Sequence, residues 1–322
     1  MLKPLVFLLI IIVVGLVCLW FFIAQPIGGS ASSSGLTIDP QRLRSHVETM
    51  VRDFSPRSYA HPDNLNGAAH YIEKHFVAAG GEVSVQEFTV SGQVYRNVIA
   101  RFGNNKTEKF IVGAHYDACG KTPGADDNGS GIAALIELAY LFGGRGQQGA
   151  IELVAYSLEE PPHFGTDSMG SYVHASRLRG EASQVAGVVV LETIGYFSEK
   201  WGSQSYPLPL LHLFYPSQGN FIAVVGRLDH RRFTAKVKAG MKGSTDLPVY
   251  SINAPATIAG IDFSDHRSYW TFGLQAVMVT DTAFYRNKAY HGPGDTPERL
   301  NYNSMAQVVV MVYEMVVNWR NE

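Results

Sequence analysis

Hydrophobic and polar positions divide the chain into a short apolar N-terminal part and a long part in which the two kinds of residue alternate. The stretch from Pro4 to Ala24 is apolar and carries no charge. A helix rising about 1.5 Å per residue would cover about 30 Å over this length, the thickness of a bilayer's hydrocarbon core. A cleaved signal peptide usually has a shorter apolar region, of about 7–15 residues. The pattern therefore predicts a transmembrane anchor over residues 1–26, with cleavage at Gly29-Ser30-Ala31 as the alternative.

Charges and small residues around this stretch predict its orientation. Lys3 and the α-amine are the only positive charges before it, and the next one is Arg42. By the positive-inside rule, the N-terminus then lies in the cytoplasm, and the rest of this cell-membrane protein lies outside it. Residues 28–35 are all Gly, Ser or Ala, which is typical of a flexible tether. We expect an anchor at 1–26, a linker at 27–38 and one globular domain at 39–322.

Helix-like and strand-like segments alternate in the remainder of the chain. Helical patterns cover residues 39–53, 64–79, 131–142, 168–178, 233–241 and 304–318. Strand patterns cover residues 82–90, 94–102, 110–114, 150–157, 187–191, 221–226 and 276–280. The central strands are apolar throughout, which indicates parallel strands with helices on both faces. We therefore expect an α/β fold, a three-layer α/β/α sandwich with a mixed, mainly parallel central sheet, and an elaborated loop at 199–219.

Composition and charge agree with a folded domain and narrow its function. Of the 322 residues, 46% are hydrophobic and 17% charged, which excludes a disordered chain. The formal net charge of −2 argues against nucleic acid as a partner. Cys18 and Cys119 are the only cysteines, so no disulfide framework is expected.

Acidic residues and histidines follow the central strands. In open α/β sheets, ligands bind beyond the carboxyl ends of the parallel strands. The residues that follow these strands or lie in the adjoining loops are His115, Asp117, Asp126, Asp127, Glu159, Glu160, Glu192, Asp281, His291 and Asp295. Each alone has an ordinary structural explanation, such as an Asp that stabilises a helix start. Together at one edge they would repel one another unless protons or cations intervened, and mixed His and carboxylate ligands suit zinc.

At these positions the chain resembles the co-catalytic di-zinc exopeptidases (clan MH). This family includes bacterial leucyl aminopeptidases, glutamate carboxypeptidase II and glutaminyl cyclases. The resemblance extends over about residues 60–318. It rests on five separated motifs, which are His115-Tyr116-Asp117, the segment from Pro123 to Gly131, Glu159-Glu160, Glu192, and Tyr290-His291 with Asp295-Thr296.

The resemblance implies two zinc ions per chain. His115 and Glu192 would ligate one ion, Glu160 and His291 the other, and Asp127 would bridge both. Glu192 departs from the family pattern, since many aminopeptidases have Asp at this position.

The resemblance also implies three further roles. Glu159 would be the general base that later donates the proton to the leaving amine. Asp117 would accept the second ring N–H of His115 and so fix its tautomer. Tyr290 matches a tyrosine that stabilises the oxyanion in some aminopeptidases, with structural packing as the alternative.

The expected function is that of a membrane-anchored zinc aminopeptidase acting on peptides outside the cytoplasm. The alternatives are a carboxypeptidase of the same fold, a glutaminyl cyclase-like acyltransferase, and a receptor that kept the fold without metals. Arg286 is a candidate partner for a substrate carboxylate, and His266 is a candidate cleft residue with a structural hydrogen bond as its alternative. Cys119 lies near His115 in sequence but lacks the signature of a catalytic nucleophile, so we expect an inert thiol.

Overall fold

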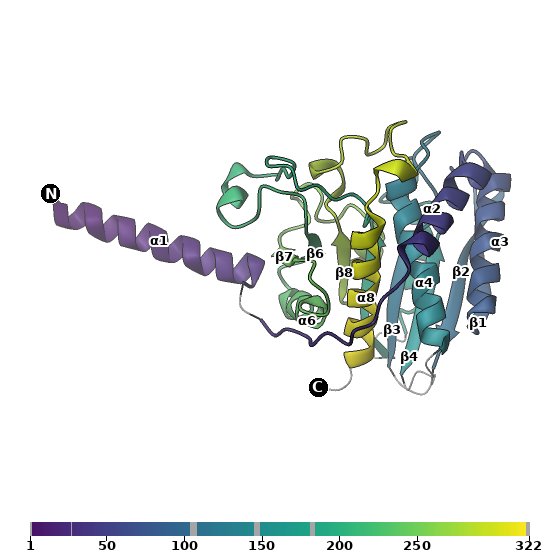
Figure 1. The fold of residues 1–322 in the computed structure, drawn as a ribbon, viewed down its shortest axis with the longest axis horizontal. Helices are drawn as coiled ribbons and strands as arrows, with labels where there is room; N and C mark the ends of the chain where they lie inside the picture. Colours follow the sequence, from purple (N-terminus) through teal and green to yellow (C-terminus); the bar gives the residue numbers. More distant parts are fainter. Residues whose placement is uncertain (1, 27, 104–107, 145–148, 181–183, 320–322) are drawn as a thin grey trace.

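The computed structural model describes residues 2–26, 28–103, 108–144, 149–180 and 184–319 (Figure 1). An eight-stranded sheet runs through the domain in the order β1-β2-β4-β3-β5-β8-β6-β7. Its strands are β1 (Glu82–Val90), β2 (Gln93–Phe102), β3 (Lys109–His115), β4 (Ala150–Tyr156), β5 (Val185–Glu192), β6 (Ile222–Gly226), β7 (Val249–Asn253) and β8 (Ala276–Thr280). The helices are α1 (Leu2–Ala24), α2 (Pro40–Phe54), α3 (Pro62–Ala78), α4 (Gly131–Gly144), α5 (Gly170–Arg177), α6 (Arg231–Met241), α7 (His266–Thr271) and α8 (Tyr302–Asn318).

The sheet is mixed and mainly parallel. β3 pairs in parallel with β4 and β5, β5 with β8, and β6 with β7. The antiparallel pairs are β1 with β2, β2 with β4, and β6 with β8. The predicted fold class is confirmed.

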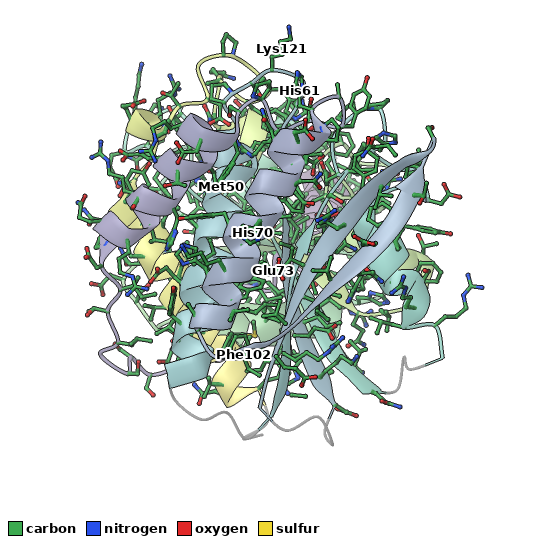
Figure 2. All side chains as sticks on the ribbon, turned by 90° about the vertical axis from the view of Figure 1, so that its right-hand side faces the viewer. Met50, His61, His70, Glu73, Phe102 and Lys121 are labelled. Carbon is green, nitrogen blue, oxygen red and sulfur yellow. The ribbon has the colours of Figure 1, made fainter. Side chains whose placement is uncertain are left out.

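Two hydrophobic cores lie on opposite faces of this sheet. Successive strand residues point to opposite faces, so Val189 and Leu191 enter one core while Val188 and Val190 enter the other. The larger core contains side chains of α2, α3, α4, α6 and α8, and the smaller one contains side chains of α5 and α7. Figure 2 looks onto α2 and α3 beside the β1–β2 hairpin. The helices therefore form a layer on each side of the sheet.

The carboxyl ends of the parallel strands meet at one edge of the domain. Lys121, in the segment after β3, lies at the top of Figure 2, and Phe102, at the end of antiparallel β2, lies at the bottom. The top edge carries the segments that follow β3, β4, β5 and β8, where the candidate site residues occur.

The apolar N-terminal stretch forms the helix α1, which projects from the domain (Figure 1). The segment Pro4–Ala24, with a mean hydropathy of 3.3, is long and apolar enough to cross a membrane. A signal sequence meets the same criteria of length and composition, so these two properties do not separate the two roles. Residues 28–38 have no helix or strand, but they follow the surface of the domain. Ala31 N–H donates to the Lys242 carbonyl, and Leu36 packs against the larger core. The boundaries expected at residues 26 and 38 stay predictions.

Two elements were not predicted from the sequence. β7 is only five residues long and lies at the edge of the sheet, and α7 has six residues. Both are too short for a periodic pattern to stand out. The expected loop at 199–219 contains one short 3-10 turn, η3 (Pro209–Leu213).

Candidate metal centre and active site

Asp127 lies at the centre of the site, between two histidines. Its Oδ1 is 3.3 Å from Nε2 of His115, and its Oδ2 is 3.0 Å from Nε2 of His291. Asp127 belongs to the turn η1 (Ala125–Ser130) before α4, and the peptide bond between Asp127 and Asn128 is cis. The two oxygens of one carboxylate therefore face two different halves of the site.

Each histidine has a glutamate as a second neighbour. Nε2 of His115 is 3.1 Å from Oε2 of Glu192, and these residues end the adjacent parallel strands β3 and β5. Nε2 of His291 is 3.1 Å from Oε2 of Glu160, which follows β4. The geometry thus forms a His115–Glu192 half-site and a His291–Glu160 half-site that share Asp127.

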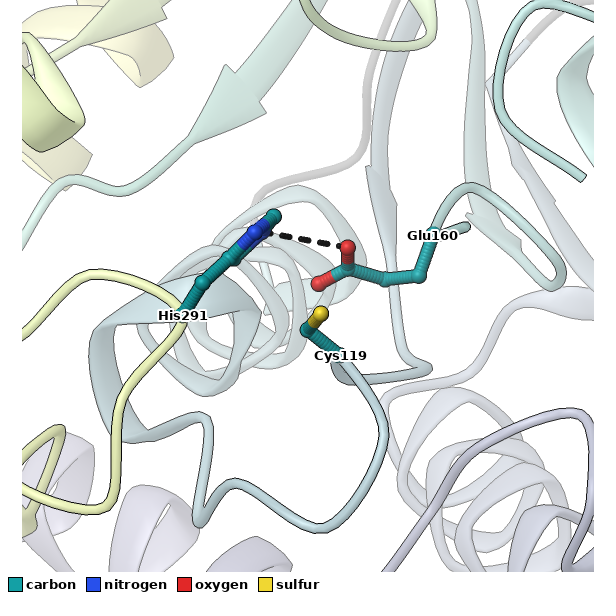
Figure 3. A group of neighbouring side chains, drawn as sticks. All are labelled: Cys119, Glu160 and His291. Atoms are coloured by element: carbon teal, nitrogen blue, oxygen red, sulfur yellow. Dashed lines mark ion pairs between the residues drawn. The ribbon is translucent and has the colours of Figure 1, made fainter. Parts of the chain in front are cut away.

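Cys119 lies beside the second half-site (Figure 3). Its Sγ, a carboxylate oxygen of Glu160 and a ring nitrogen of His291 all lie within 4.8 Å of one another. Burial raises the pKa of the Cys119 thiol, which disfavours a role as nucleophile. Cys119 nevertheless adds a sulfur donor at the edge of the site that the sequence analysis set aside.

Asp117 holds the segment that carries Glu159 and Glu160. Its carboxylate accepts hydrogen bonds from the backbone N–H groups of both glutamates, at 3.2 and 3.1 Å. Its Oδ1 is also 3.5 Å from Nδ1 of His115, while the Asp117 carbonyl oxygen is 3.2 Å from the same nitrogen. Both oxygens of Asp117 thus lie near this ring nitrogen, the carbonyl oxygen closer than the carboxylate, and the expected role of Asp117 in fixing the tautomer stays a prediction.

Asp295 supports Asp127 in a similar way. Its two carboxylate oxygens accept the backbone N–H groups of Asp126 and Asp127, at 3.0 and 3.1 Å. The carboxylate of Asp126 accepts hydrogen bonds from Gly195 N–H and Asn287 Nδ2. Asp126 and Asp295 therefore hold the turn η1, which carries Asp127, in place.

Two further residues that support the site were not predicted from the sequence. Arg57 is fully buried and donates to the carbonyl oxygens of Tyr116, Pro123 and Gly124, in the segment that joins His115 to Asp127. No sequence pattern marks it, because it lies between helices. Ser264 donates to Oε2 of Glu192 at 2.7 Å, and its only mark in the sequence is that it lies two residues before His266, the candidate cleft residue.

The backbone near the site adopts left-handed conformations at non-glycine residues. φ is 61° at Leu158, 47° at Thr193 and 54° at His291. Leu158 precedes Glu159 and Thr193 follows Glu192, so the strain lies next to the functional side chains. Such conformations cost roughly 1–3 kcal/mol each, and they persist only where the surrounding structure holds them.

Burial and charge have opposing effects on the pKa values of the site. Burial, with a contribution from Asp127, raises the pKa of Glu160 to about 8. Burial also raises the pKa of Glu159 and of Glu192. Burial lowers the pKa of His115, but Glu192 and Glu159 outweigh this effect and raise that pKa well above its usual range. The buried carboxylates therefore need protons or cations to neutralise them.

The donor atoms of the site fit zinc. Oδ2 of Asp127 and Oε1 of Glu160 are buried and accept no hydrogen bond from any described residue. His115, Asp127 and Glu160 each offer a donor atom within 4.8 Å of the other two. Imidazole nitrogens and carboxylate oxygens are ligands that zinc prefers, and a metal would satisfy the two oxygens that accept no hydrogen bond.

An apolar pocket of about 760 Å³, including the space at its mouth, opens beside the site. Glu192 and Tyr290 line the pocket where it meets the site, and its walls include Tyr206, Phe221 and Met278. Glu192 is the only charged side chain among the described residues that line it. The pocket therefore suits an uncharged, apolar group.

Tyr290, His266 and Arg286 differ in their relation to this pocket. Tyr290 stacks on His291, with 4.0 Å between ring centroids, so both the catalytic and the packing role remain predictions. His266 is buried, and its Nε2 lies 2.8 Å from the Ile261 carbonyl oxygen. This contact is the structural hydrogen bond that the sequence offered as the alternative to a cleft role. Arg286 is also buried and donates to Gln204 Oε1, so it is not available to a substrate carboxylate.

Comparisons with known proteins agree with the fold. The model of Peptidase family M28 matches residues 97–316. The uncharacterized protein YfbL of Escherichia coli K12 is 44% identical over 324 residues, covering 98% of this chain and 99% of that protein. A probable leucine aminopeptidase of Trichophyton verrucosum is 24% identical over 293 residues, covering 86% of this chain and 72% of that protein.

Two solved structures have the same fold. The LapA aminopeptidase of Legionella pneumophila superimposes with a TM-score of 0.68 at 20% identity, covering 88% of this chain and 73% of that one. BSAP, a zinc aminopeptidase from Bacillus subtilis, superimposes with a TM-score of 0.70 at 14% identity, covering 87% of this chain and 95% of that one.

Proposed function

Because the chain belongs to peptidase family M28 and is thus a metallopeptidase, we propose that it is a zinc aminopeptidase that removes apolar residues from the N-termini of peptides outside the cytoplasm. The family predicted from the five sequence motifs is confirmed. The enzyme class, a hydrolase that acts on peptides, follows from the family.

Two zinc ions per chain are proposed, one in each half-site. His115, Glu192 and Oδ1 of Asp127 would hold one ion, and His291, Glu160 and Oδ2 of Asp127 would hold the other. The distances that support this assignment lie between 3.0 and 3.3 Å. Zinc, when bound, polarises a carbonyl group and lowers the pKa of water.

Glu159 is proposed to take the proton of the attacking water and to deliver it to the leaving amine. Its Oε2 lies 3.9 Å from Nε2 of His115, whereas Glu192 approaches the same nitrogen to 3.1 Å. Glu159 is therefore close to the ligands without being the nearest donor, which leaves its carboxylate available to hold a proton. Tyr290, at the pocket side, is proposed to stabilise the oxyanion.

No Arg or Lys side chain occurs among the described residues that line the pocket, and this observation carries the choice of an aminopeptidase. A carboxypeptidase must hold the substrate's terminal carboxylate, normally with an Arg or Lys. Arg286, the one candidate from the sequence, is buried against Gln204 and Phe221. Glu192, the one charged side chain of the described lining, instead suits the positive charge of a free N-terminus.

A panel of three peptides tests this proposal. One peptide has a free N-terminal Leu, the second is the same peptide acetylated at its N-terminus, and the third begins with Gln. We expect release of Leu from the first alone, measured by mass spectrometry of the products. C-terminal trimming of the acetylated peptide would identify a carboxypeptidase, and loss of ammonia from the third without cleavage would identify a cyclase.

α1 is proposed to remain on the protein as a single membrane span, with its N-terminus in the cytoplasm. The carbonyl oxygens at its end accept hydrogen bonds from the domain, including one from Lys238 Nζ to Ala24, which supports retention of the helix over cleavage. A reporter fused after Glu322 should be active only outside the cytoplasm. A mature chain beginning near Ser32 would instead identify a cleaved signal peptide.

A further inference from the structure

We propose that the segment 199–219 makes a second contact with the lipid bilayer, beside α1, through a leucine patch formed by Leu208, Leu210 and Leu213. This inference rests on the part of the proposed function in which α1 crosses a membrane. It adds a surface of the domain itself that enters the interfacial region of the same bilayer.

The end of α1 is fixed to the domain by hydrogen bonds. The Ala24 carbonyl accepts hydrogen bonds from Lys238 Nζ at 3.0 Å and from Ser251 Oγ at 2.9 Å, and the Ile23 carbonyl accepts one from Asn253 Nδ2 at 3.2 Å. The last carbonyl groups of a helix have no partner within it, and here α6 and β7 supply the donors. The direction of α1 therefore determines how the domain faces the membrane.

The segment 199–219 reaches beyond the end of α1, into the depth of the apolar span. The ring of Phe214 stacks on that of Trp20, with 6.4 Å between centroids and an interplanar angle of 17°. Trp20 lies four residues before Ala24, which is about 6 Å along a helix. Elements that lie in a bilayer interface are buried to about 5–10 Å. Figure 1 shows this segment extending from the sheet toward the side on which α1 projects.

The 3-10 turn η3 has one side that packs against the end of α1 and another side that is exposed. Residues three apart lie on the same side of such a turn. Leu211 is buried and Phe214 is half-buried, and both belong to the cluster around Ala24 and Trp20. Leu210 and Leu213 lie on another side, where they are 45% and 69% exposed.

The leucine patch is unusual for a surface in water. Leu208 is 50% exposed, and outside α1 no other leucine of the described residues is as exposed as the three in the patch. Arg231 lies over the ring of Phe22, with 4.9 Å from its Cζ to the ring centroid, so a positive charge occurs near the end of the span. Exposed leucines next to Phe214, which stacks on Trp20, and a cation near the end of the span together fit the interfacial region of a bilayer.

The contact also locates the substrate pocket. Tyr206 and Tyr215 belong to the cluster around the end of α1, and both line the apolar pocket beside the metal site. The same segment therefore forms a wall of the pocket on one side and faces the bilayer on the other. Peptide ends at the membrane surface are the substrates that this arrangement would meet first.

Lipid quenching of a fluorophore tests the contact in the full chain. Leu213→Cys is made in a Cys18→Ala background, labelled with an environment-sensitive dye, and reconstituted in vesicles of phosphatidylethanolamine and phosphatidylglycerol. A nitroxide near the top of the acyl chains serves as the quencher. Val77→Cys is the matched control, because Val77 is 58% exposed and lies on α3, on the opposite side of the domain from α1. The background chain without an added cysteine corrects for labelling of Cys119.

We expect the dye at position 213 to lose more than about half of its emission to the quencher, as for an interfacial group, while the dye at position 77 keeps its emission. Equal, weak quenching at both positions, in a chain that resists extraction by carbonate, would overturn the leucine patch contact and leave the anchor intact. Release of the chain by carbonate would instead refute the anchoring role of α1 and the contact with it. A dye at position 213 whose emission indicates an apolar environment, but which the lipid nitroxide does not quench, would identify a second protein copy as the occupant. That result would overturn the lipid assignment.

Discussion

Replacing Glu159 with Gln separates proton transfer from metal binding. The two side chains have the same size, and the backbone N–H of residue 159 keeps its hydrogen bond to Asp117. Oε2 of Glu159 is 3.9 Å from Nε2 of His115, but Glu192 and Asp127 approach that nitrogen to 3.1 and 3.3 Å. We therefore expect zinc content to change little. Loss of the base should lower kcat by about 10²–10⁴-fold, or about 3–5 kcal/mol of activation free energy.

Glu160→Gln is the matched variant at the next position. Oε2 of Glu160 is 3.1 Å from Nε2 of His291, so this change removes a negatively charged donor from the second half-site. Zinc per chain should fall toward one, and added zinc should restore part of the turnover. Metal analysis and kcat are measured on both full-length variants. Metal loss in the Glu159 variant with metal retained in the Glu160 variant would mean that the two roles are reversed, and an unchanged kcat in the former would refute the base.

Three further variants test the surrounding structure. Arg57→Met should lower the free energy of unfolding by about 3–5 kcal/mol, because three buried carbonyl groups lose their donor, and urea denaturation measures this. Burial raises the pKa of Glu152, but His174 and Lys109 outweigh it and bring that pKa to about 2, below the ordinary 4.5. The charged form therefore stabilises the fold above pH 4.5, and Glu152→Gln should lower the free energy of unfolding by about 3 kcal/mol at neutral pH. This loss should shrink as the pH falls from 4.5 toward 2, and a loss independent of pH would contradict the reasoning. Ala223→Phe, within the pocket, should raise KM for peptides that begin with Leu but not for those that begin with Ala, and equal effects would count against the pocket.

The positions of the candidate ligands could be predicted because chain connectivity determines them. His115 and Glu192 end the parallel strands β3 and β5, so their side chains reach the same edge of the sheet. Glu160 follows β4 closely and arrives there for the same reason. His291 lies further along the loop after β8, so the strand order placed it only near this edge, and the family resemblance gave it the role of a ligand.

The supporting structure could not be predicted in the same way. Arg57 contacts carbonyl groups far along the chain, and backbone carbonyls leave no mark in a sequence. The left-handed conformations of Leu158 and Thr193 oppose the local preferences of leucine and threonine, so tertiary contacts must impose them. The carboxylate of Asp117 accepts two backbone N–H groups, a contact that depends on the path of the loop after β4 rather than on residue type.

The paired hydrogen bonds that Asp117 and Asp295 accept bear on the order of folding and metal binding. Each carboxylate accepts hydrogen bonds from two consecutive backbone N–H groups in a segment that carries proposed ligands, and these hydrogen bonds need no metal. The ligand loops can thus take their final shape as soon as the chain has folded. The domain could therefore complete its fold first and acquire its ions afterwards. Which ion the protein carries would then depend on the metals available after folding and not on those present during synthesis.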